Sequence, residues 1–302
     1  MKAAAFDYIR ADSLAQALEL LARHGNDAKL IAGGQSLVPM MAMRLVRPAL
    51  LIDIHRLAEL QSISRHGQEV QIGAGVRQRT LEDDTAMHTL LPLVAKALRW
   101  VGHAQTRNRG TVGGSLVHAD PSAELPLAAL VLDAKLRLAS HTGGERVMQA
   151  ADFFVGPMQS ATGETECLSS IAWPAWEGSG IGAAFDEVAI RHGDFALASA
   201  AAQVQLDAQG ICRRANFGAG GVDGVPRAFP AIAQGLVGQR LEPNLLRSVA
   251  TAAAAACDPG NDPHASADYR RHLATILIVR VLREAAQAAA QSLRGEPAGK
   301  QA

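Results

Sequence analysis

The feature that most constrains this chain is a pair of glycines placed between a predicted strand and a predicted helix. Residues 29–31 (Lys-Leu-Ile) are typical of a short strand, residues 32–36 read Ala-Gly-Gly-Gln-Ser, and helical spacing of apolar residues resumes from Ser36. Glycines let the backbone adopt a positive φ and let a ligand approach closely. The free N–H groups at the start of a helix attract anions, so the pattern indicates an anion nest suited to a diphosphate. Taken alone, this loop fits an ordinary tight turn better.

A second motif repeats the chemistry of the first. Residues 111–115 read Thr-Val-Gly-Gly-Ser, with paired glycines flanked by hydroxyl side chains. Two such nests are able to hold one pyrophosphate from opposite sides, so together they favour a nucleotide cofactor. Two other glycine-rich stretches do not support this reading. Gln78 replaces the third glycine of a dinucleotide fingerprint at residues 73–78, which indicates a strand-to-turn transition, and residues 218–221 are interpreted as a flexible loop.

Two acidic side chains follow the second motif directly. Asp120 and Glu124 are placed to accept hydrogen bonds from a bound cofactor, but helix capping before and after Pro121 explains them equally well. Asp53 follows the first motif by about 20 residues, as a ribose-binding acid would, yet we favour a strand-end aspartate that caps the next turn. The basic residues 107–109 (Arg-Asn-Arg) fit either neutralisation of a diphosphate or a solvated surface turn.

Composition excludes several classes of protein. The 302 residues include 29 Lys+Arg and 29 Asp+Glu, and this balance removes the electrostatic argument for a nucleic-acid or anionic-membrane binder. No apolar run approaches the roughly 20 residues of a membrane span. His103 and His118 lack partners at metal-ligand spacing, and Ser36 and Ser115 do not lie in a GxSxG motif. We therefore expect neither a zinc site nor a serine hydrolase.

The three cysteines, Cys167, Cys212 and Cys257, stand far apart in the sequence. Without a CxxC pair, this chain is not expected to hold a zinc ribbon or an iron–sulfur cluster by itself. A disulfide framework is equally unexpected, and this cysteine usage suits a reducing cytoplasm.

The periodic segments predict a protein of the α+β class. Gly and Pro at residues 173–180 (Trp-Pro-Ala-Trp-Glu-Gly-Ser-Gly) mark a linker or long loop between an N-terminal part and a smaller C-terminal part. Beyond it, strands are expected at residues 200–206 and 212–217, followed by helices at residues 245–257 and 266–293. Within the N-terminal part, Thr80 is expected to cap a helix that begins at Leu81.

The glycine motifs belong to longer stretches, residues 32–54 and 107–126, which resemble the two FAD loops of the flavoprotein subunits of molybdenum hydroxylases. Residues 191–196 (Arg-His-Gly-Asp-Phe-Ala) and 265–271 (Ala-Ser-Ala-Asp-Tyr-Arg-Arg) are also similar to this family, so the resemblance covers almost the whole chain. The family includes the medium subunits of aerobic carbon monoxide dehydrogenase and the middle domain of xanthine dehydrogenase.

The resemblance implies an FAD-binding fold of the p-cresol methylhydroxylase type followed by a C-terminal α+β domain. The expected boundaries are residues 1–55 for the first FAD-binding subdomain and 56–175 for the second. Residues 176–290 would form the C-terminal domain, and residues 291–302 a flexible tail.

The resemblance also implies a function. This chain would carry FAD, take electrons from two [2Fe–2S] clusters of a small partner subunit and pass them to an external acceptor. A large partner subunit would carry the molybdenum–pterin cofactor and oxidise the substrate, and the assembly would be a dimer of heterotrimers in the cytoplasm. A free-standing FAD oxidase or dehydrogenase, and a non-catalytic assembly subunit, are the alternatives.

Site residues follow from the same resemblance, and none of them is assigned a catalytic or metal-binding role. The residues expected to bind the cofactor are Leu30, Ile31, Ala32, Gly33, Gly34, Gln35, Ser36, Leu37, Val101, Thr111, Gly113, Gly114, Ser115, His118, Asp120, Glu124, Leu168 and Asp186. Of these, Val101 would sandwich the adenine together with Leu168, with Trp100 as the alternative to Val101, and Glu124 would touch the ribityl or flavin end. Asp186 stands where xanthine dehydrogenase-like members carry a lysine, which leaves the flavin potential and the identity of the acceptor open.

Overall fold

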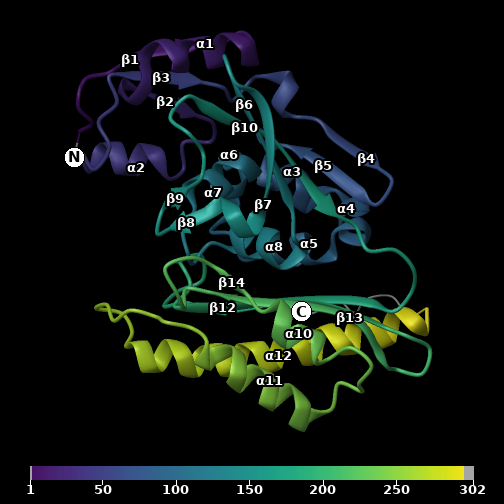
Figure 1. The fold of residues 1–302 in the computed structure, drawn as a ribbon. Helices are drawn as coiled ribbons and strands as arrows, with labels where there is room; N and C mark the ends of the chain where they lie inside the picture. The colour runs from purple at the N-terminus through teal and green to yellow at the C-terminus, as the bar shows by residue number, and fades with distance from the viewer. Residues whose placement is uncertain (1, 296–302) are drawn as a thin grey trace. The chain divides into compact units, whose positions relative to one another are not determined.

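A computed structural model describes residues 2–295 as two compact units, each built of helices and strands (Figure 1). The first unit contains residues 2–83, 103–119 and 134–173, and the second contains residues 84–102, 120–133 and 174–295. The chain therefore passes between the units several times before residue 174. The predicted α+β class is confirmed.

The first unit begins with a small parallel sheet that positions the first glycine motif. Its strands β1 (Asp7–Arg10) and β2 (Ala28–Ile31) flank the central strand β3 (Leu50–Asp53), in the order β1-β3-β2. Helix α1 (Leu14–His24) buries an apolar stripe beside this sheet, and its first turn is capped by Ser13, whose hydroxyl accepts from the Gln16 N–H.

A five-stranded sheet forms the rest of the first unit. Its strands, in order, are β4 (Ile63–His66), β5 (Glu69–Gly73), β10 (Glu166–Pro174), β6 (Lys135–Ser140) and β7 (Gly144–Gln149). The shorter elements of this unit are α2 (Leu37–Ala42), α3 (Gln78–Asp83), α6 (Ala104–Arg109), α7 (Val112–His118), α9 (Ala150–Phe153), β8 (Phe154–Gly156) and β9 (Gln159–Ser160).

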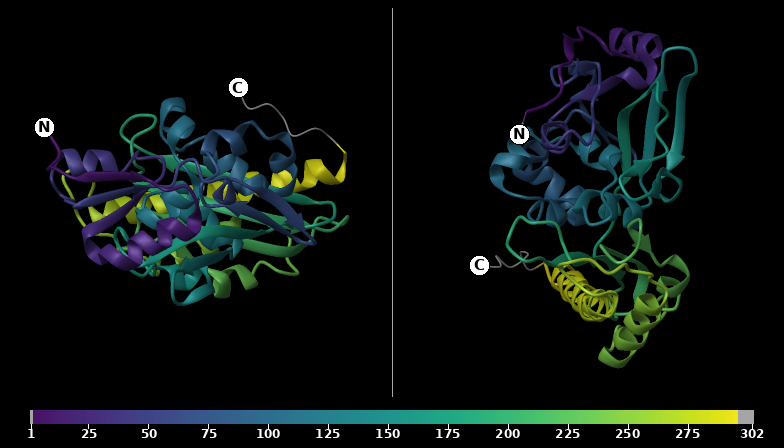
Figure 2. Two further views of the ribbon diagram at one scale, coloured as in Figure 1. Left: turned by 90° about the horizontal axis from the view of Figure 1, so that it is seen from above. Right: turned by 90° about the vertical axis from the view of Figure 1, so that its left-hand side faces the viewer.

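The second unit is organised around an antiparallel sheet. Its strands are β11 (Ile181–Val188), β12 (Ala198–Leu206), β13 (Cys212–Gly220) and the short β14 (Arg227–Ala228). Helices α11 (Pro243–Ala255) and α12 (Ala267–Leu293) cover one face, and α12 runs along the strands (Figure 2). Helices α5 (Pro92–Leu98) and α8 (Glu124–Leu132) lie on the other side of the sheet (Figure 1). Helices α4 (Thr85–Leu90) and α10 (Pro230–Gln234) complete the unit.

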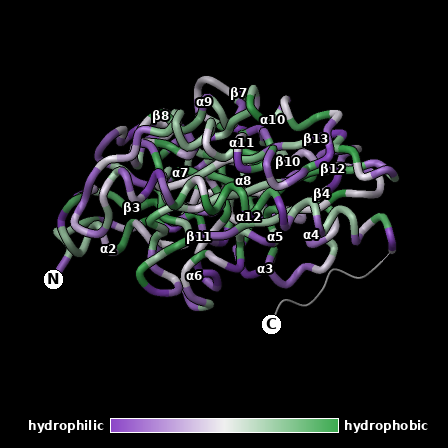
Figure 3. Tube along the Cα trace, turned by 90° about the horizontal axis from the view of Figure 1, so that it is seen from below, coloured by the Kyte–Doolittle hydropathy of each residue, from purple (hydrophilic) through white to green (hydrophobic). Residues whose placement is uncertain are grey.

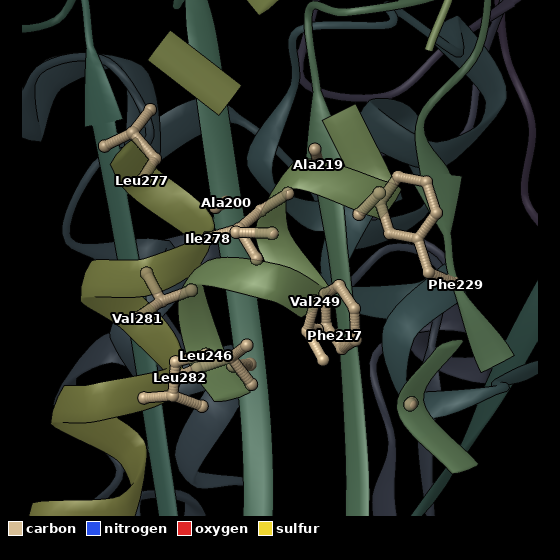
Figure 4. Close-up of a cluster of buried hydrophobic side chains, with 14 of the residues drawn as sticks. Ala200, Phe217, Ala219, Phe229, Leu246, Val249, Leu277, Ile278, Val281 and Leu282 are labelled. Atoms are coloured by element: carbon tan, nitrogen blue, oxygen red, sulfur yellow. The ribbon is translucent and has the colours of Figure 1, made fainter. Parts of the chain in front are cut away.

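Small side chains let α12 approach this sheet closely. Ala200 and Ala219 project from neighbouring strands toward Ile278, and Phe217 fills the space beside Val249 (Figure 4). Helix α8 on the other side is apolar around almost its whole circumference (Figure 3), because it is buried on more than one side.

Most of the predicted strands and the two C-terminal helices are confirmed, but three details differ. Helix α3 already includes Thr80, and the chain then restarts as α4 because the Asp84 carboxylate accepts from the Ala86 N–H at 2.9 Å. Residues 218–220 belong to strand β13 and are not a flexible loop. Glycine is needed at position 218 because a Cβ there would overlap the carbonyl oxygen of Arg227 and lie 2.7 Å from Val131 of α8.

The predicted tail begins within helix α12, which ends at Leu293. Residues 296–302 of that tail lie outside the described residues. Within residues 2–295, no helix combines the length and the apolar character that crossing a bilayer requires.

Candidate functional site

The first glycine motif presents a run of unused backbone donors. It connects strand β2 to helix α2, and Gly34 adopts a φ of 70°. The N–H groups of residues 33–37 find no acceptor within residues 2–295. The Val38 N–H is the first that is engaged, because it donates to the Gly34 carbonyl at 3.1 Å in the first turn of α2. Five consecutive free donors fit the oxygens of a diphosphate, as an anion nest requires, and binding at this motif stays a prediction.

Gly33 brings the two glycine motifs together. A Cβ on Gly33 would overlap the carbonyl oxygen of Arg109 and lie 2.9 Å from the Cα of Gly110. The Arg77 guanidinium donates to the same Arg109 carbonyl and fixes its position. Both motifs therefore lie side by side within the first unit, as a shared diphosphate site requires.

The second motif differs from the prediction. Thr111 caps helix α7, and its hydroxyl accepts from the Gly114 N–H at 3.0 Å. The Val112 and Gly113 N–H groups donate to the carbonyls of Val76 and Ala74, at 3.0 and 2.9 Å. The N–H groups of this turn are thus used by the protein, so the prediction of a second nest was wrong.

The paired glycines of α7 have a packing role and a surface role. A Cβ on Gly113 would lie 2.8 Å from the Cα of Ala74, so only glycine fits there. Gly114 is exposed and Ser115 is half-buried, and these two residues form the accessible start of the helix. They leave a small, polar surface beside the first motif.

Burial separates Arg107 from the other two residues of the basic segment. Arg107 is buried and forms two hydrogen bonds to the Glu82 carboxylate, with Nε–Oε2 and Nη2–Oε1 distances of 2.8 and 2.9 Å. This geometry ties α6 to α3 and gives Arg107 a structural role. Asn108 and Arg109 are exposed at the end of α6.

Asp53 behaves as the favoured strand-end cap. Its carboxylate accepts from the His55 N–H at 2.9 Å, from the His55 ring and from the Tyr8 hydroxyl. Burial raises the pKa of Asp53, but these hydrogen bonds outweigh it and hold the pKa below its usual value.

Four of the predicted site residues belong to the second unit: Val101, Asp120, Glu124 and Asp186. Asp120 is buried and accepts from the Ser122 N–H at 2.8 Å, which makes it a turn residue, while Ala123 occupies the cap position of α8. Glu124 is the buried first residue of α8, and Val101 is also buried.

The carboxylate of Asp186 forms an ion pair with Arg280. Its Oδ2 lies 2.5 Å from Nη1 of Arg280 on helix α12. An ion pair between β11 and α12 therefore lies at position 186, where the family resemblance predicts a lysine in xanthine dehydrogenase-like members.

The remaining predicted residues lie in the first unit. Leu30 and Ile31 are half-buried in β2, Ala32 follows them, and Leu37 begins α2. Gln35 is exposed, and its side-chain amide donates to the Gly33 carbonyl at 3.1 Å. Leu168 is buried in β10, and His118 ends α7.

One buried acid was not recognised as a site residue from the sequence. Glu187 lies beside Asp186 in β11 and is 7% exposed. Burial raises the pKa of Glu187 most, and the negative charges of Glu124 and Asp186 raise it further, to about 9. Alternation along β11 was the available signal, since it places Glu187 on the opposite face from Asp186.

Comparisons with known proteins identify the family and the fold. Residues 4–176 match the family described as "FAD binding domain in molybdopterin dehydrogenase", and residues 183–285 match "CO dehydrogenase flavoprotein C-terminal domain". The α subunit of the 6-hydroxypseudooxynicotine dehydrogenase complex of Paenarthrobacter nicotinovorans is 40% identical over 94% of this chain and 96% of its own.

Two solved structures share the fold. A chain of quinoline 2-oxidoreductase from Pseudomonas putida 86 has 36% identity and a TM-score of 0.90, covering 96% of this chain and 99% of its own. A chain of carbon monoxide dehydrogenase from Hydrogenophaga pseudoflava, in a form that lacks the Mo-pyranopterin moiety of its molybdenum cofactor, has 33% identity. That match has a TM-score of 0.90 and covers 94% of this chain and 98% of the other. The predicted FAD-binding fold with a C-terminal α+β domain is confirmed.

Proposed function

Because this chain belongs to the family of FAD-binding subunits of molybdopterin dehydrogenases, we propose that it carries electrons through FAD within a multi-subunit molybdenum hydroxylase. When bound, FAD supplies the redox chemistry, and this chain supplies its position and electrostatic surroundings. The observation that carries the proposal is the run of five free N–H groups at residues 33–37, adjoining the second glycine motif.

The free N–H groups of residues 33–37 would hold the diphosphate, with the exposed Gly114 and the Ser115 hydroxyl beside them. Arg77 and the exposed Arg109 lie beside Gly33, so their positive charge would add to the directed hydrogen bonds in holding the diphosphate. The rest of the proposed cofactor-binding set is Leu30, Ile31, Ala32, Val101, Thr111, Gly113, His118, Asp120, Glu124, Leu168 and Asp186.

The proposed partners are a large subunit with the molybdenum–pterin cofactor and a small subunit with two [2Fe–2S] clusters. One relative is a subunit of a dehydrogenase complex, and one solved relative is an enzyme with a molybdenum cofactor, which supports this assembly. In it, substrate oxidation would take place in the large subunit, and two heterotrimers would pair.

Domain boundaries and location remain proposals as well. We propose FAD-binding subdomains at residues 1–55 and 56–175, and a C-terminal domain that begins at residue 176 and extends to the end of helix α12 at Leu293, three residues beyond the predicted boundary at residue 290. A cytoplasmic location is supported by the spacing of the three cysteines in the sequence.

Purification of the full-length chain through an affinity tag from its native host tests the proposal. We expect a yellow complex in which mass spectrometry finds one large and one small additional chain, and in which FAD, iron and molybdenum are all present. A chain that binds FAD without partners and is bleached by a substrate would instead indicate a free-standing oxidase or dehydrogenase. Partners with iron and molybdenum but no flavin would indicate an assembly subunit.

A further inference from the structure

The two faces of the sheet in the second unit differ in polarity. Side chains of β12 that face α11 and α12 are apolar, and they belong to one buried cluster with those helices (Figure 4). The opposite face, toward α8, carries Glu187, Ser199 and Gln203, each with a buried side-chain oxygen that has no hydrogen-bond partner within residues 2–295. Unpartnered buried oxygens are costly, so three on one face call for a physical explanation.

The strand register places two of these groups next to each other. Glu187 of β11 pairs directly with Ser199 of β12, and Ser199 pairs with Gly220 of β13. A Cβ on Gly220 would lie 2.6 Å from the Ser199 hydroxyl oxygen and 3.2 Å from the carbonyl oxygen of Pro121. Gly220 therefore leaves room for the Ser199 hydroxyl on the face that leads to the start of α8.

A second carboxyl group acts on Glu187 from this side. Glu124 begins α8, is 8% exposed and interacts electrostatically with Glu187. Two ionised carboxylates at this depth would repel each other in a medium of low dielectric constant, and both would lose hydration.

The other charge that acts on Glu187 also disfavours its ionised form. Asp186, on the opposite face, adds negative charge, and its partner Arg280 is already engaged by it at 2.5 Å. The charge of Lys96, on helix α5 packed against β11, interacts electrostatically with Arg99 and Glu284. Ser199 on β12 is neutral. The pKa of Glu187 at about 9 agrees with this arrangement.

We propose that Glu187 and Glu124 form a buried acid pair that holds one proton, on the Glu187 carboxyl, and leaves a single negative charge, on Glu124, at the start of α8. The neutral acid needs no counter-charge, and its O–H is able to donate to a neighbouring oxygen. Glu187 is a positioning residue in this pair, because it sets the charge at Glu124 and does not itself touch the coenzyme.

The consequence for the coenzyme rests on the proposed function. If Glu124 contacts bound FAD, a proton on Glu187 limits the negative charge beside an already anionic coenzyme to one. Loss of that proton at high pH would weaken FAD binding.

The pair also links stability to pH. An isolated glutamate in the unfolded chain loses its proton near pH 4.3, whereas folded Glu187 keeps it to about pH 9. The folded state therefore binds one more proton between these values, and the stabilisation present at low pH is lost as the pH rises toward 9.

Infrared spectroscopy of the flavin-free full chain at pH 7.5 tests the proton directly. We expect the C=O stretch of a protonated carboxyl group in the wild type, which disappears as the pH is raised through about 9. The band should be missing from Glu187→Gln and present in the control Glu242→Gln, whose side chain is exposed. A wild-type spectrum without this band, or with a band that Glu187→Gln retains, would overturn the proposal.

Urea unfolding at pH 6 and pH 8 gives an independent measure. The wild-type unfolding constant should rise by up to tenfold per pH unit more than that of Glu187→Gln, because the variant has no proton to lose at this position. Equal pH dependence of the two proteins would overturn the proposal, whether or not the chain binds FAD.

FAD titrations separate this inference from the proposed function. Between pH 7 and pH 9.5, FAD affinity should fall more for the wild type than for Glu187→Gln. Failure of both proteins to bind FAD at any pH would refute the proposed function, while the infrared result would still decide whether the acid pair exists. Binding with the same pH dependence in both would refute the effect of Glu187 on the coenzyme.

Discussion

Gly33 packs against the carbonyl group of Arg109, although the two residues belong to different glycine motifs. A Cβ on Gly33 would overlap that carbonyl oxygen and lie 2.9 Å from the Cα of Gly110. The close approach explains why a glycine is needed at this position. It also places the free N–H groups after Gly33 next to the start of helix α7.

Gly33→Ala should therefore damage both stability and FAD binding. The added methyl group meets backbone atoms, which cannot move aside as a side chain can, and we expect a loss of about 1–3 kcal/mol. Gly260→Ala is the matched control, because a Cβ there meets nothing within 4 Å. Denaturant unfolding of both variants checks this, and equal midpoints would contradict the packing role of Gly33.

Arg107 should contribute more to stability than its neighbour Arg79, although both pair with Glu82. Arg107 and Glu82 have side chains only 11% and 17% exposed, so Arg107→Ala leaves a carboxylate without its buried partner, at a cost of about 3 kcal/mol. Arg79 is 43% exposed, and Arg79→Ala should cost much less. Thermal or urea unfolding measures both, and a larger loss for Arg79→Ala would refute this assignment.

Tyr8→Phe should make the chain less stable at neutral pH but change little at strongly acid pH. The Tyr8 hydroxyl donates to the Asp53 carboxylate and helps to lower its pKa. A lowered pKa gives stability that is present above the unfolded value near 3.8 and is lost as the pH falls through the folded value. Unfolding curves at pH 7 and pH 3 test this, and a difference between the proteins that grows at pH 3 would be the wrong sign.

The Asp186–Arg280 ion pair predicts the outcome of introducing the lysine found in xanthine dehydrogenase-like members. Asp186→Lys should destabilise the second unit, because the new ammonium group faces the Arg280 guanidinium. Adding Arg280→Glu should restore most of the loss, which we place at about 1 kcal/mol because Arg280 is 42% exposed. A double-mutant cycle of unfolding free energies measures the coupling, and additive effects would show that the pair is not coupled.

The sequence located the first glycine motif because its signal is local, although this motif alone did not distinguish a nest from a tight turn. A strand, two glycines and a helix follow one another, and the five free N–H groups at residues 33–37 result from that order. The long helix at residues 266–293 was predictable for the same reason, since Ser266 caps it and apolar residues recur along it.

The role of the second motif could not be predicted in the same way. Whether the N–H groups of Val112 and Gly113 are free depends on Ala74 and Val76, which are more than 30 residues away in sequence. Gly218 and Gly220 resembled loop glycines for a similar reason, because what they accommodate is contributed by α8 and by Ser199. Tertiary contacts, absent from local patterns, decide each of these cases.

The burial of Glu187 and the charges around it could not be predicted from the local sequence either. Its burial depends on two covering elements, and the repulsion it experiences comes from Glu124, which is remote in sequence. Alternation along β11 separates Glu187 from Asp186, but only the folded structure shows that Asp186 faces α12 and Glu187 the other side of the sheet.

Titration of the full-length chain with FAD, followed by quenching of flavin fluorescence, tests the central claim most directly. The account predicts saturable uptake of one FAD per chain by the wild type and by His141→Ala, whose side chain is exposed. Gly114→Val should bind FAD much more weakly, because its side chain would cover the exposed start of α7 and displace the Thr111 hydroxyl, 2.8 Å from the new Cβ. No uptake by the wild type, or equal affinity in all three proteins, would contradict the account.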